Sequence, residues 1–209
     1  MKLVIVKYNA GNIQSVLYAL ERIGCGAEVT DDKARIAGAD KVIFPGVGEA
    51  STAMEYLRAR GLDAAIRGLR QPVLGICLGM QLLCSYSEEN DTDCLGIFEE
   101  RVRKFEPGDG PAKVSQIVAA PAATKVPQIG WNNIYDLETP LFEGVADGSW
   151  CYFVHGYYAA LGTHAIAKTD YVQPYSSALH RGNFYGVQFH PEKSAQTGEK
   201  ILKNFIELI

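Results

Sequence analysis

Apolar and polar residues follow two alternating patterns through the N-terminal part of the chain. Residues 3–6 form a continuous apolar run, which is typical of a buried parallel strand. Apolar side chains then recur every three or four positions over residues 13–23, which is the period of a helix. Short apolar runs at 27–30 and 41–44 predict two further strands. This alternation of strands and helices predicts an α/β fold.

The same patterns continue to the C-terminus. A strand predicted at 73–76 leads directly into Cys77, and helical spacing resumes after it. Other helices are predicted at residues 54–61, 62–70, 78–83 and 197–209. Short β-like runs separated by turn residues lie at 150–154, 164–169, 177–180 and 185–189. Their close spacing predicts antiparallel additions to the sheet.

The composition favours one domain spanning residues 1–209. A chain of 209 residues with 47% hydrophobic residues is long enough to bury one substantial core. Residues 106–127 are rich in Pro, Gly and Ala, and we expect a surface excursion there. A linker is less consistent with the sequence, because the segment that follows would not form a credible separate core.

Net charge, cysteine content and the lengths of the apolar runs argue against several classes of protein. The net charge of -4 argues against a nucleic-acid-binding face. The five cysteines form no Cys-x-x-Cys pair, so the sequence indicates neither a disulfide framework nor a zinc ribbon. The chain contains no apolar run long enough for a membrane span. We therefore expect a cytoplasmic protein that has no membrane or nucleic-acid partner.

Cys77 stands where the apolar run at 73–76 gives way to helical spacing, with Gly75 and Gly79 on either side of it. Glycines allow the sharp turn that would lift a thiol out of the core. Backbone N–H groups at the start of the following helix would stabilise a thiolate. Cys77 is therefore a candidate nucleophile, and a buried structural cysteine is the alternative.

A cysteine nucleophile needs a base, and histidine is the usual one. Among the four histidines, His190 ends an apolar run, and Glu192 lies two residues beyond it, where its carboxylate could orient the imidazole. A structural histidine at a strand end is the alternative. The loop of residues 45–48, Pro-Gly-Val-Gly, also follows a predicted strand, so it is either a ligand-binding loop or a plain turn.

Together these segments resemble the class I, triad-type glutamine amidotransferases, with their flavodoxin-like α/β fold. The resemblance rests on residues 75–81 (Gly-Ile-Cys-Leu-Gly-Met-Gln), 188–192 (Gln-Phe-His-Pro-Glu) and 45–48. More narrowly, the chain is similar to the glutaminase subunits of imidazole glycerol phosphate synthases. That similarity is carried by Gly11-Asn12, Lys125-Val126-Pro127, Gly130-Trp131-Asn132, Phe153-Val154-His155 and residues 190–194.

The resemblance implies that Cys77 attacks the side-chain amide of glutamine, that His190 moves protons and that Glu192 orients His190. The product would be ammonia plus glutamate, formed through a γ-glutamyl thioester without metal or cofactor. The oxyanion hole would use the N–H groups of Val47 and Leu78, after the Gly46–Val47 peptide reorients. Glutamine would be held by Gly48, Gln81 and Glu89, with Glu89 facing the substrate ammonium.

The same resemblance implies a partner, a cyclase subunit with a (β/α)8 barrel. It would receive the ammonia and form imidazole glycerol phosphate and an aminoimidazole carboxamide ribotide in histidine biosynthesis. The partner face would comprise Asn12, Ile129, Trp131, Tyr157 and Lys193. Aromatic residues often anchor interfaces, although partly buried core aromatics are an alternative.

Three positions depart from the family pattern. Lys7 stands where Asp is usual, Gln128 where His is usual, and Gly156 where Ser or Thr is frequent. None belongs to the triad, so these departures concern the partner interface. Two other functions compete with the first: an amidotransferase that serves another synthase, and a catalytically idle scaffold. The segments around Pro127 and Trp131 argue against the first, and the intact triad residues argue against the second.

Overall fold

The computed structural model describes residues 1–9, 12–106 and 125–209. The Ala-rich part of the predicted surface excursion, residues 112–124, lies outside this described part, as does Gly11.

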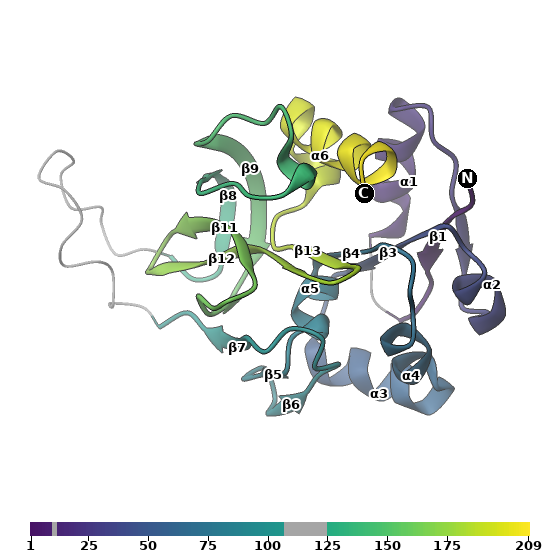
Figure 1. The fold of residues 1–209 in the computed structure, drawn as a ribbon. Coiled ribbons are helices and arrows are strands. Elements are labelled where there is room, and N and C mark those ends of the chain that lie inside the picture. Colours follow the sequence, from purple (N-terminus) through teal and green to yellow (C-terminus); the bar gives the residue numbers. More distant parts are fainter. Residues whose placement is uncertain (10–11, 107–124) are drawn as a thin grey trace, which may run out of the picture.

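Five adjacent parallel strands form one side of the main sheet (Figure 1). In spatial order they are β2 (Glu28–Thr30), β1 (Leu3–Val6), β3 (Lys41–Gly46), β4 (Val73–Cys77) and β13 (Phe184–Val187). With β13 counted as the fifth strand, this is the 2-1-3-4-5 order of flavodoxin-like folds. The predicted α/β class and its flavodoxin-like sheet are therefore confirmed.

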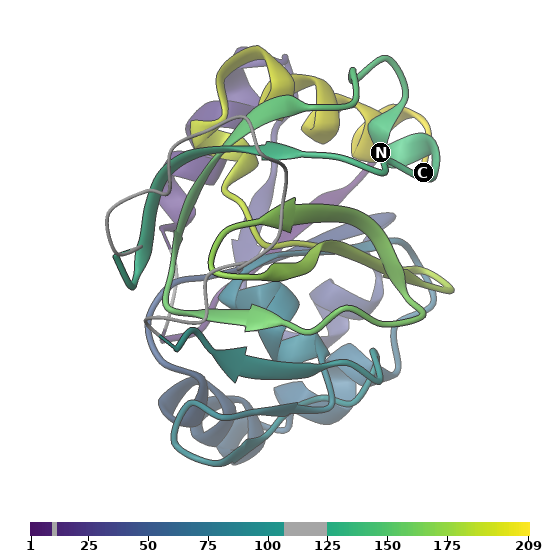
Figure 2. The ribbon, with the colours of Figure 1, turned by 90° about the vertical axis from the view of Figure 1, so that its left-hand side faces the viewer.

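Beyond β13 the sheet continues with mostly antiparallel strands. They are β12 (Pro174–Arg181), β10 (Tyr157–Ala159), β7 (Arg101–Lys104), β5 (Tyr86–Ser87) and β6 (Thr92–Asp93), with β11 (Ala165–Asp170) paired to β12. A separate two-stranded sheet joins β8 (Gln128–Ile134) to β9 (Ser149–His155). Figure 2 shows this second sheet running close to the C-terminal helix.

Helices cover both faces of the parallel strands (Figure 1). One face carries α1 (Ile13–Arg22) and α6 (Ala195–Glu207), and the other carries α2 (Lys33–Ala37), α3 (Ala50–Arg60), α4 (Leu62–Arg67) and α5 (Leu78–Leu83). Two short 3-10 helices complete the described part, η1 (Pro140–Phe142) and η2 (Pro191–Lys193).

Alternation along β1 shows why this layered packing forms. Leu3 and Ile5 belong to the apolar cluster beneath α1 and α6, whereas Val4 and Val6 belong to the cluster beneath the helices of the other face. Successive side chains of a strand point to opposite faces, so a strand covered on both sides must be apolar throughout. The continuous run at 3–6 therefore marks a central strand.

Most of the predicted strands and helices are present in the structure, but one strand pairs differently and several short elements were not predicted. The run at 185–189 was expected to be an antiparallel addition, but β13 pairs parallel with β4 and antiparallel with β12. Residue spacing cannot decide this, because the two partners are distant in sequence. The elements that were not predicted are short or interrupted by polar residues; they include α2, β5, β6, β8 and β10. Among the described residues, no helix is long and apolar enough to cross a membrane.

Candidate active site

Three adjacent parallel strands bring the candidate residues together at their carboxyl ends. β4 lies between β3 and β13, and Gly46 at the end of β3 is level with Cys77 at the end of β4. Val187 at the end of β13 is level with Ile76, so the segment leading to His190 leaves the sheet beside Cys77. In open α/β sheets, ligands bind outside these carboxyl ends.

Cys77 sits at a sharp bend between β4 and α5, with φ 53° and ψ −112°. A positive φ is uncommon for a residue with a Cβ and is found at functional turns. The turn therefore strains the cysteine itself, contrary to the expectation that the flanking glycines would supply the bend. Those glycines are needed for close packing. A Cβ on Gly79 would overlap the carbonyl oxygen of Phe44, and one on Gly75 would lie 2.9 Å from the backbone nitrogen of Met80.

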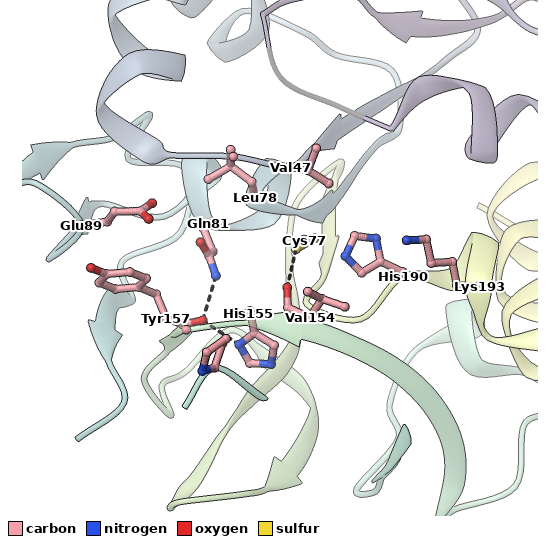
Figure 3. A pocket seen from close by; sticks show the side chains of 13 residues that line it. Val47, Cys77, Leu78, Gln81, Glu89, Val154, His155, Tyr157, His190 and Lys193 are labelled. Carbon is pink, nitrogen blue, oxygen red and sulfur yellow. Dashed lines mark hydrogen bonds between the residues drawn. The ribbon is translucent and has the colours of Figure 1, made fainter. Parts of the chain in front are cut away.

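The Cys77 sulfur has two polar neighbours besides His190. Its Sγ lies 3.8 Å from the carbonyl oxygen of Val154 on β9. The side-chain amide nitrogen of Gln188 lies 3.7 Å from the same sulfur. The thiol is buried yet lines a cavity of about 320 Å³, so a small substrate could reach it (Figure 3).

His190 and Glu192 form a buried pair. The imidazole Nδ1 is 2.8 Å from Oε1 of Glu192, and the two side chains are 3% and 1% exposed. Burial lowers the pKa of His190, but the charge of Cys77, hydrogen bonds with Cys77 and Glu192, and the charge of Glu192 together raise it to about 10. The imidazole thus has a carboxylate at Nδ1 and lines the same cavity as the Cys77 thiol.

Backbone contacts hold the His190 turn against the second sheet. The His190 N–H donates to the Tyr152 carbonyl of β9 at 2.9 Å. The Ser194 hydroxyl donates to the His190 carbonyl at 2.7 Å and accepts the Tyr152 N–H at 2.9 Å. The position of the base therefore depends on β9 as well as on the main sheet.

The cavity collects the predicted substrate residues around the thiol (Figure 3). Among the residues predicted for chemistry or substrate binding, those that line it are Val47, Gly48, Cys77, Leu78, Gln81, Glu89 and His190. Glu192 lies behind His190 and contacts it directly. All three regions that were predicted separately, the 45–48 loop, the Cys77 turn and the His190 turn, therefore meet here.

Gln81 and Glu89 are both held by hydrogen bonds within the protein. The Gln81 side-chain nitrogen donates to the Tyr157 carbonyl and to Oε1 of Gln188, each at 2.9 Å. Glu89 accepts the Ala50 N–H at 2.8 Å. Burial raises the pKa of Glu89, the hydrogen bond from Ala50 lowers it, and the charge of Glu49 raises it, with a net upward shift.

Two buried polar residues of the site were not assigned a role from the sequence. His155 lines the cavity, and its Nδ1 lies 2.7 Å from the Tyr157 carbonyl. Gln188 is fully buried and contacts both Gln81 and the thiol. Their positions in the sequence could have identified them, because each is a polar residue that follows a run of apolar residues leading to the site.

Gln128, one of the three departures from the family pattern, joins the same network. The Tyr175 hydroxyl donates to Oε1 of Gln128 at 3.0 Å and lies 3.3 Å from Nε2 of His155. Gly156, a second departure, lines the cavity, whereas Lys7 is exposed.

The predicted partner residues divide into two groups. Tyr157 and Lys193 line the cavity itself. Ile129 and Trp131 lie on the outer face of β8, where they are 64% and 49% exposed. Asn12 precedes the first residue of α1 and is outside the cavity lining.

No group of three or more His, Cys, Asp or Glu side chains in the described residues is arranged to hold a metal ion. All five cysteines lie in the described part, and each is free.

Comparisons with known proteins agree with this fold. The family model described as glutamine amidotransferase class-I matches residues 4–208. A crystal structure of a glutamine amidotransferase superposes with a TM-score of 0.69 at 20% identity, covering 98% of this chain and 97% of that chain. PurLQS from Thermotoga maritima superposes with a TM-score of 0.68 at 17% identity, with the same coverage. At these identities the structural likeness supports the fold alone. The chain belongs to the class I glutamine amidotransferase family.

Within that family, the relatives of this chain include imidazole glycerol phosphate synthase subunits named HisH. The subunit from Bacteroides fragilis is 53% identical over 208 residues, and that from Bacteroides thetaiotaomicron is 52% identical over the same length; each comparison covers 100% of both chains. The subunit from Shewanella loihica is 42% identical, covering 98% of this chain and 90% of that one. By these matches the chain is a member of the HisH family.

Proposed function

We propose that this chain hydrolyses glutamine to glutamate and ammonia as the glutaminase subunit of an imidazole glycerol phosphate synthase. One observation carries the proposal: the strained Cys77 turn opens into a cavity that it shares with His190, whose far nitrogen is bound by Glu192. A thiol, a base and a group that orients the base are the minimum set for nucleophilic catalysis by cysteine.

The reaction follows from these roles. Cys77 gives its proton to His190 and attacks the side-chain amide carbon of glutamine, forming a tetrahedral intermediate. His190 returns the proton to the leaving nitrogen, and ammonia departs from a γ-glutamyl thioester. Water then attacks the thioester with His190 as base, which releases glutamate and restores the thiol. Glu192 stabilises the imidazolium that forms in each half of the cycle.

The oxyanion of each tetrahedral intermediate would be held by backbone N–H groups of Leu78 and Val47. Leu78 is the first residue of α5, where N–H groups lack a partner within the helix. Val47 follows Gly46, whose peptide must reorient to present the second N–H. Such donors contribute on the order of 3 kcal/mol each to transition-state stabilisation in other acyl-transfer enzymes.

Glutamine itself would be bound by Gly48, Gln81 and Glu89. Both internal hydrogen bonds of Gln81 use its nitrogen, which leaves its carbonyl oxygen as an acceptor for the substrate ammonium. Glu89 would add a carboxylate on the same side. Gly48 has a φ of 112°, which glycine adopts without strain, and it would bring the backbone close to the substrate.

The ammonia would pass to a cyclase subunit with a (β/α)8 barrel, which uses it in histidine biosynthesis, and the two chains would form a heterodimer. Asn12, Ile129, Trp131, Tyr157 and Lys193 would contact that partner. The exposure of Ile129 and Trp131 supports this, because large apolar side chains in contact with water are typical of interfaces.

We further propose that residues 1–209 act as a single domain and that the protein works in the cytoplasm. The main sheet combines strands from both ends of the chain, which supports one unit. Five free cysteines are consistent with a reducing compartment.

The decisive experiment replaces the nucleophile. Cys77→Ala should lower glutamine hydrolysis by at least about a thousandfold, measured with the cyclase subunit and its ribonucleotide substrate present. Cys94→Ala, a change at another buried cysteine that does not line the cavity, is the matched control and should retain activity. A chloroketone analogue of glutamine should label Cys77 alone. Undiminished hydrolysis by Cys77→Ala, or labelling of Cys84 or Cys151 instead, would refute the mechanism.

A further inference from the structure

The carbonyl oxygen of Tyr157 is shared by two side chains of the site (Figure 3). Gln81 approaches it with its side-chain nitrogen at 2.9 Å, and His155 approaches it with Nδ1 at 2.7 Å. A carbonyl oxygen only accepts hydrogen bonds, so both of these nitrogens must donate. Burial lowers the pKa of His155 to about 4, so the ring is neutral near pH 7 and has a single N–H, which lies on Nδ1.

The fixed orientation of Gln81 determines that of Gln188. The Gln81 nitrogen also faces the Gln188 side chain at 2.9 Å, and since that nitrogen donates, Gln188 must present its oxygen there. The reversed amide would bring two NH₂ groups together in a site where Gln188 is fully buried and Gln81 is 4% exposed. The Gln188 nitrogen is thereby directed at the Cys77 sulfur, 3.7 Å away.

We propose that Gln188 is a positioning residue that donates a hydrogen bond to the nucleophilic sulfur and thereby favours its thiolate form. This inference rests on the proposed role of Cys77. A nitrogen donor cannot take up the thiol hydrogen, which leaves His190 as the base that receives it. The donated hydrogen bond also compensates a buried negative charge on sulfur, which water cannot reach from this side.

The same contact links the nucleophile to the substrate residue Gln81. Gln188 accepts from Gln81 with its oxygen and donates to Cys77 with its nitrogen, so one amide keeps the two at a fixed separation. The chain of hydrogen bonds begins at the Tyr157 carbonyl, directly beside the cavity.

The test uses two variants of Gln188 and the rate at which iodoacetamide alkylates Cys77, followed by peptide mass analysis. Gln188→Met removes both polar contacts at similar volume. It should lower the alkylation rate constant at neutral pH about tenfold, the usual effect of losing one hydrogen bond to a charged group. Gln188→Glu keeps the acceptor for Gln81 but places a carboxylate against the sulfur, and it should lower the rate further. In both variants the pH midpoint of alkylation should rise.

Gln71→Met is the matched control. Gln71, like Gln188, donates a hydrogen bond from its side-chain amide, in this case to the Ile36 carbonyl at 2.8 Å, but it is outside the cavity lining. The Gln71→Met variant should have a lower melting temperature than the parent and the same alkylation profile at Cys77.

If both Gln188 variants alkylate with the parent's rate and pH profile, Gln188 is only a structural residue and the proposal is wrong. Gln188→Glu keeps the shape and the Gln81 contact, so it provides the test if Gln188→Met does not fold. The readout does not require turnover, so it is independent of the Cys77→Ala experiment. A failure of the glutaminase mechanism would leave the alkylation result intact.

Discussion

Some oxygen atoms of this site can only accept hydrogen bonds, and they fix the orientation of the side chains that face them. The Tyr157 carbonyl forces the orientation of both His155 and Gln81. The Glu192 carboxylate does the same for His190, because its oxygen at 2.8 Å requires a proton on Nδ1. Nε2 is therefore the imidazole nitrogen that remains available as the base in the proposed mechanism.

His155 leads to a prediction about acid stability. Burial lowers its pKa to about 4, partly opposed by the hydrogen bond to Tyr157, while the charge of His190 lowers it further. A histidine in the unfolded chain titrates near about 6.5, so between about pH 6.5 and 4 the unfolded state binds more protons. The stabilisation is complete above about pH 6.5 and is lost as the pH falls, by roughly 3 kcal/mol in total.

This loss can be measured by urea unfolding at several pH values. The free energy of unfolding of His155→Gln should fall less between neutral pH and about pH 4 than that of the parent protein, by an amount on the order of 2 kcal/mol. Carboxylates titrate in both proteins and cancel in the comparison. Identical slopes against pH would show that the buried His155 does not control acid unfolding.

At the scale of elements, the site depends on close backbone packing. The turn at Cys77 requires Gly79 because α5 lies against the carbonyl of Phe44 on β3. Helix α6 packs in the same way against η2, the 3-10 helix that carries Glu192, since a Cβ on Gly198 would overlap the carbonyl oxygen of Pro191. A tight fit between α6 and η2 therefore supports the His190–Glu192 pair.

Gly198→Ala tests this dependence. Replacing a glycine by alanine inside a helix ordinarily stabilises it by about 1 kcal/mol. Here the overlap should reverse the sign and cost about 1–3 kcal/mol, as overpacking does. The displaced η2 should also lower kcat. Thermal unfolding and glutaminase kinetics measure the two effects.

Gly26→Ala is the control for that substitution. No atom lies within 4 Å of a Cβ built on Gly26, so its stability and kcat should stay close to those of the parent. A Gly198→Ala protein as stable and as active as Gly26→Ala would contradict the packing argument.

At the scale of the whole molecule, the second sheet connects the active site to an exposed surface. β9 contributes the Val154 carbonyl beside the thiol and the backbone that holds His190. Its partner strand β8 carries Ile129 and Trp131 on the outer face, and Ile129 lies opposite Val154. A protein bound to this face would thus lie one strand away from the Cys77 thiol.

Trp131→Ala is therefore expected to weaken binding of the proposed cyclase subunit by about 2 kcal/mol, or roughly 30-fold in Kd, because aromatic side chains commonly anchor interfaces. Stability of the isolated chain should change little, since Trp131 is 49% exposed. Isothermal titration with the cyclase subunit measures the effect.

Leu161→Ala serves as the comparison, because Leu161 has similar exposure, 47%, but lies in the loop after β10 rather than on the second sheet. It should leave Kd unchanged. Equal affinities for the Trp131 and Leu161 variants would remove Trp131 from the interface.

The sequence by itself determined the α/β class, most of the strands and helices, and the candidate residues that the structure brings together. Apolar periodicity reports which faces of a segment are buried, so β1, β4 and α6 were predicted close to their observed bounds. Cys77, His190 and Glu192 were selected because each stands where a strand pattern ends or just beyond it.

The tertiary structure alone decided which strand ends meet and how their side chains are oriented. The parallel pairing of β13 with β4 joins segments that are far apart in the chain, and no local pattern encodes that choice. The positive φ of Cys77 and the directed amide of Gln188 depend on neighbours supplied by β3, α5 and β10. Local periodicity specifies burial, whereas the geometry of the site comes from contacts between distant segments.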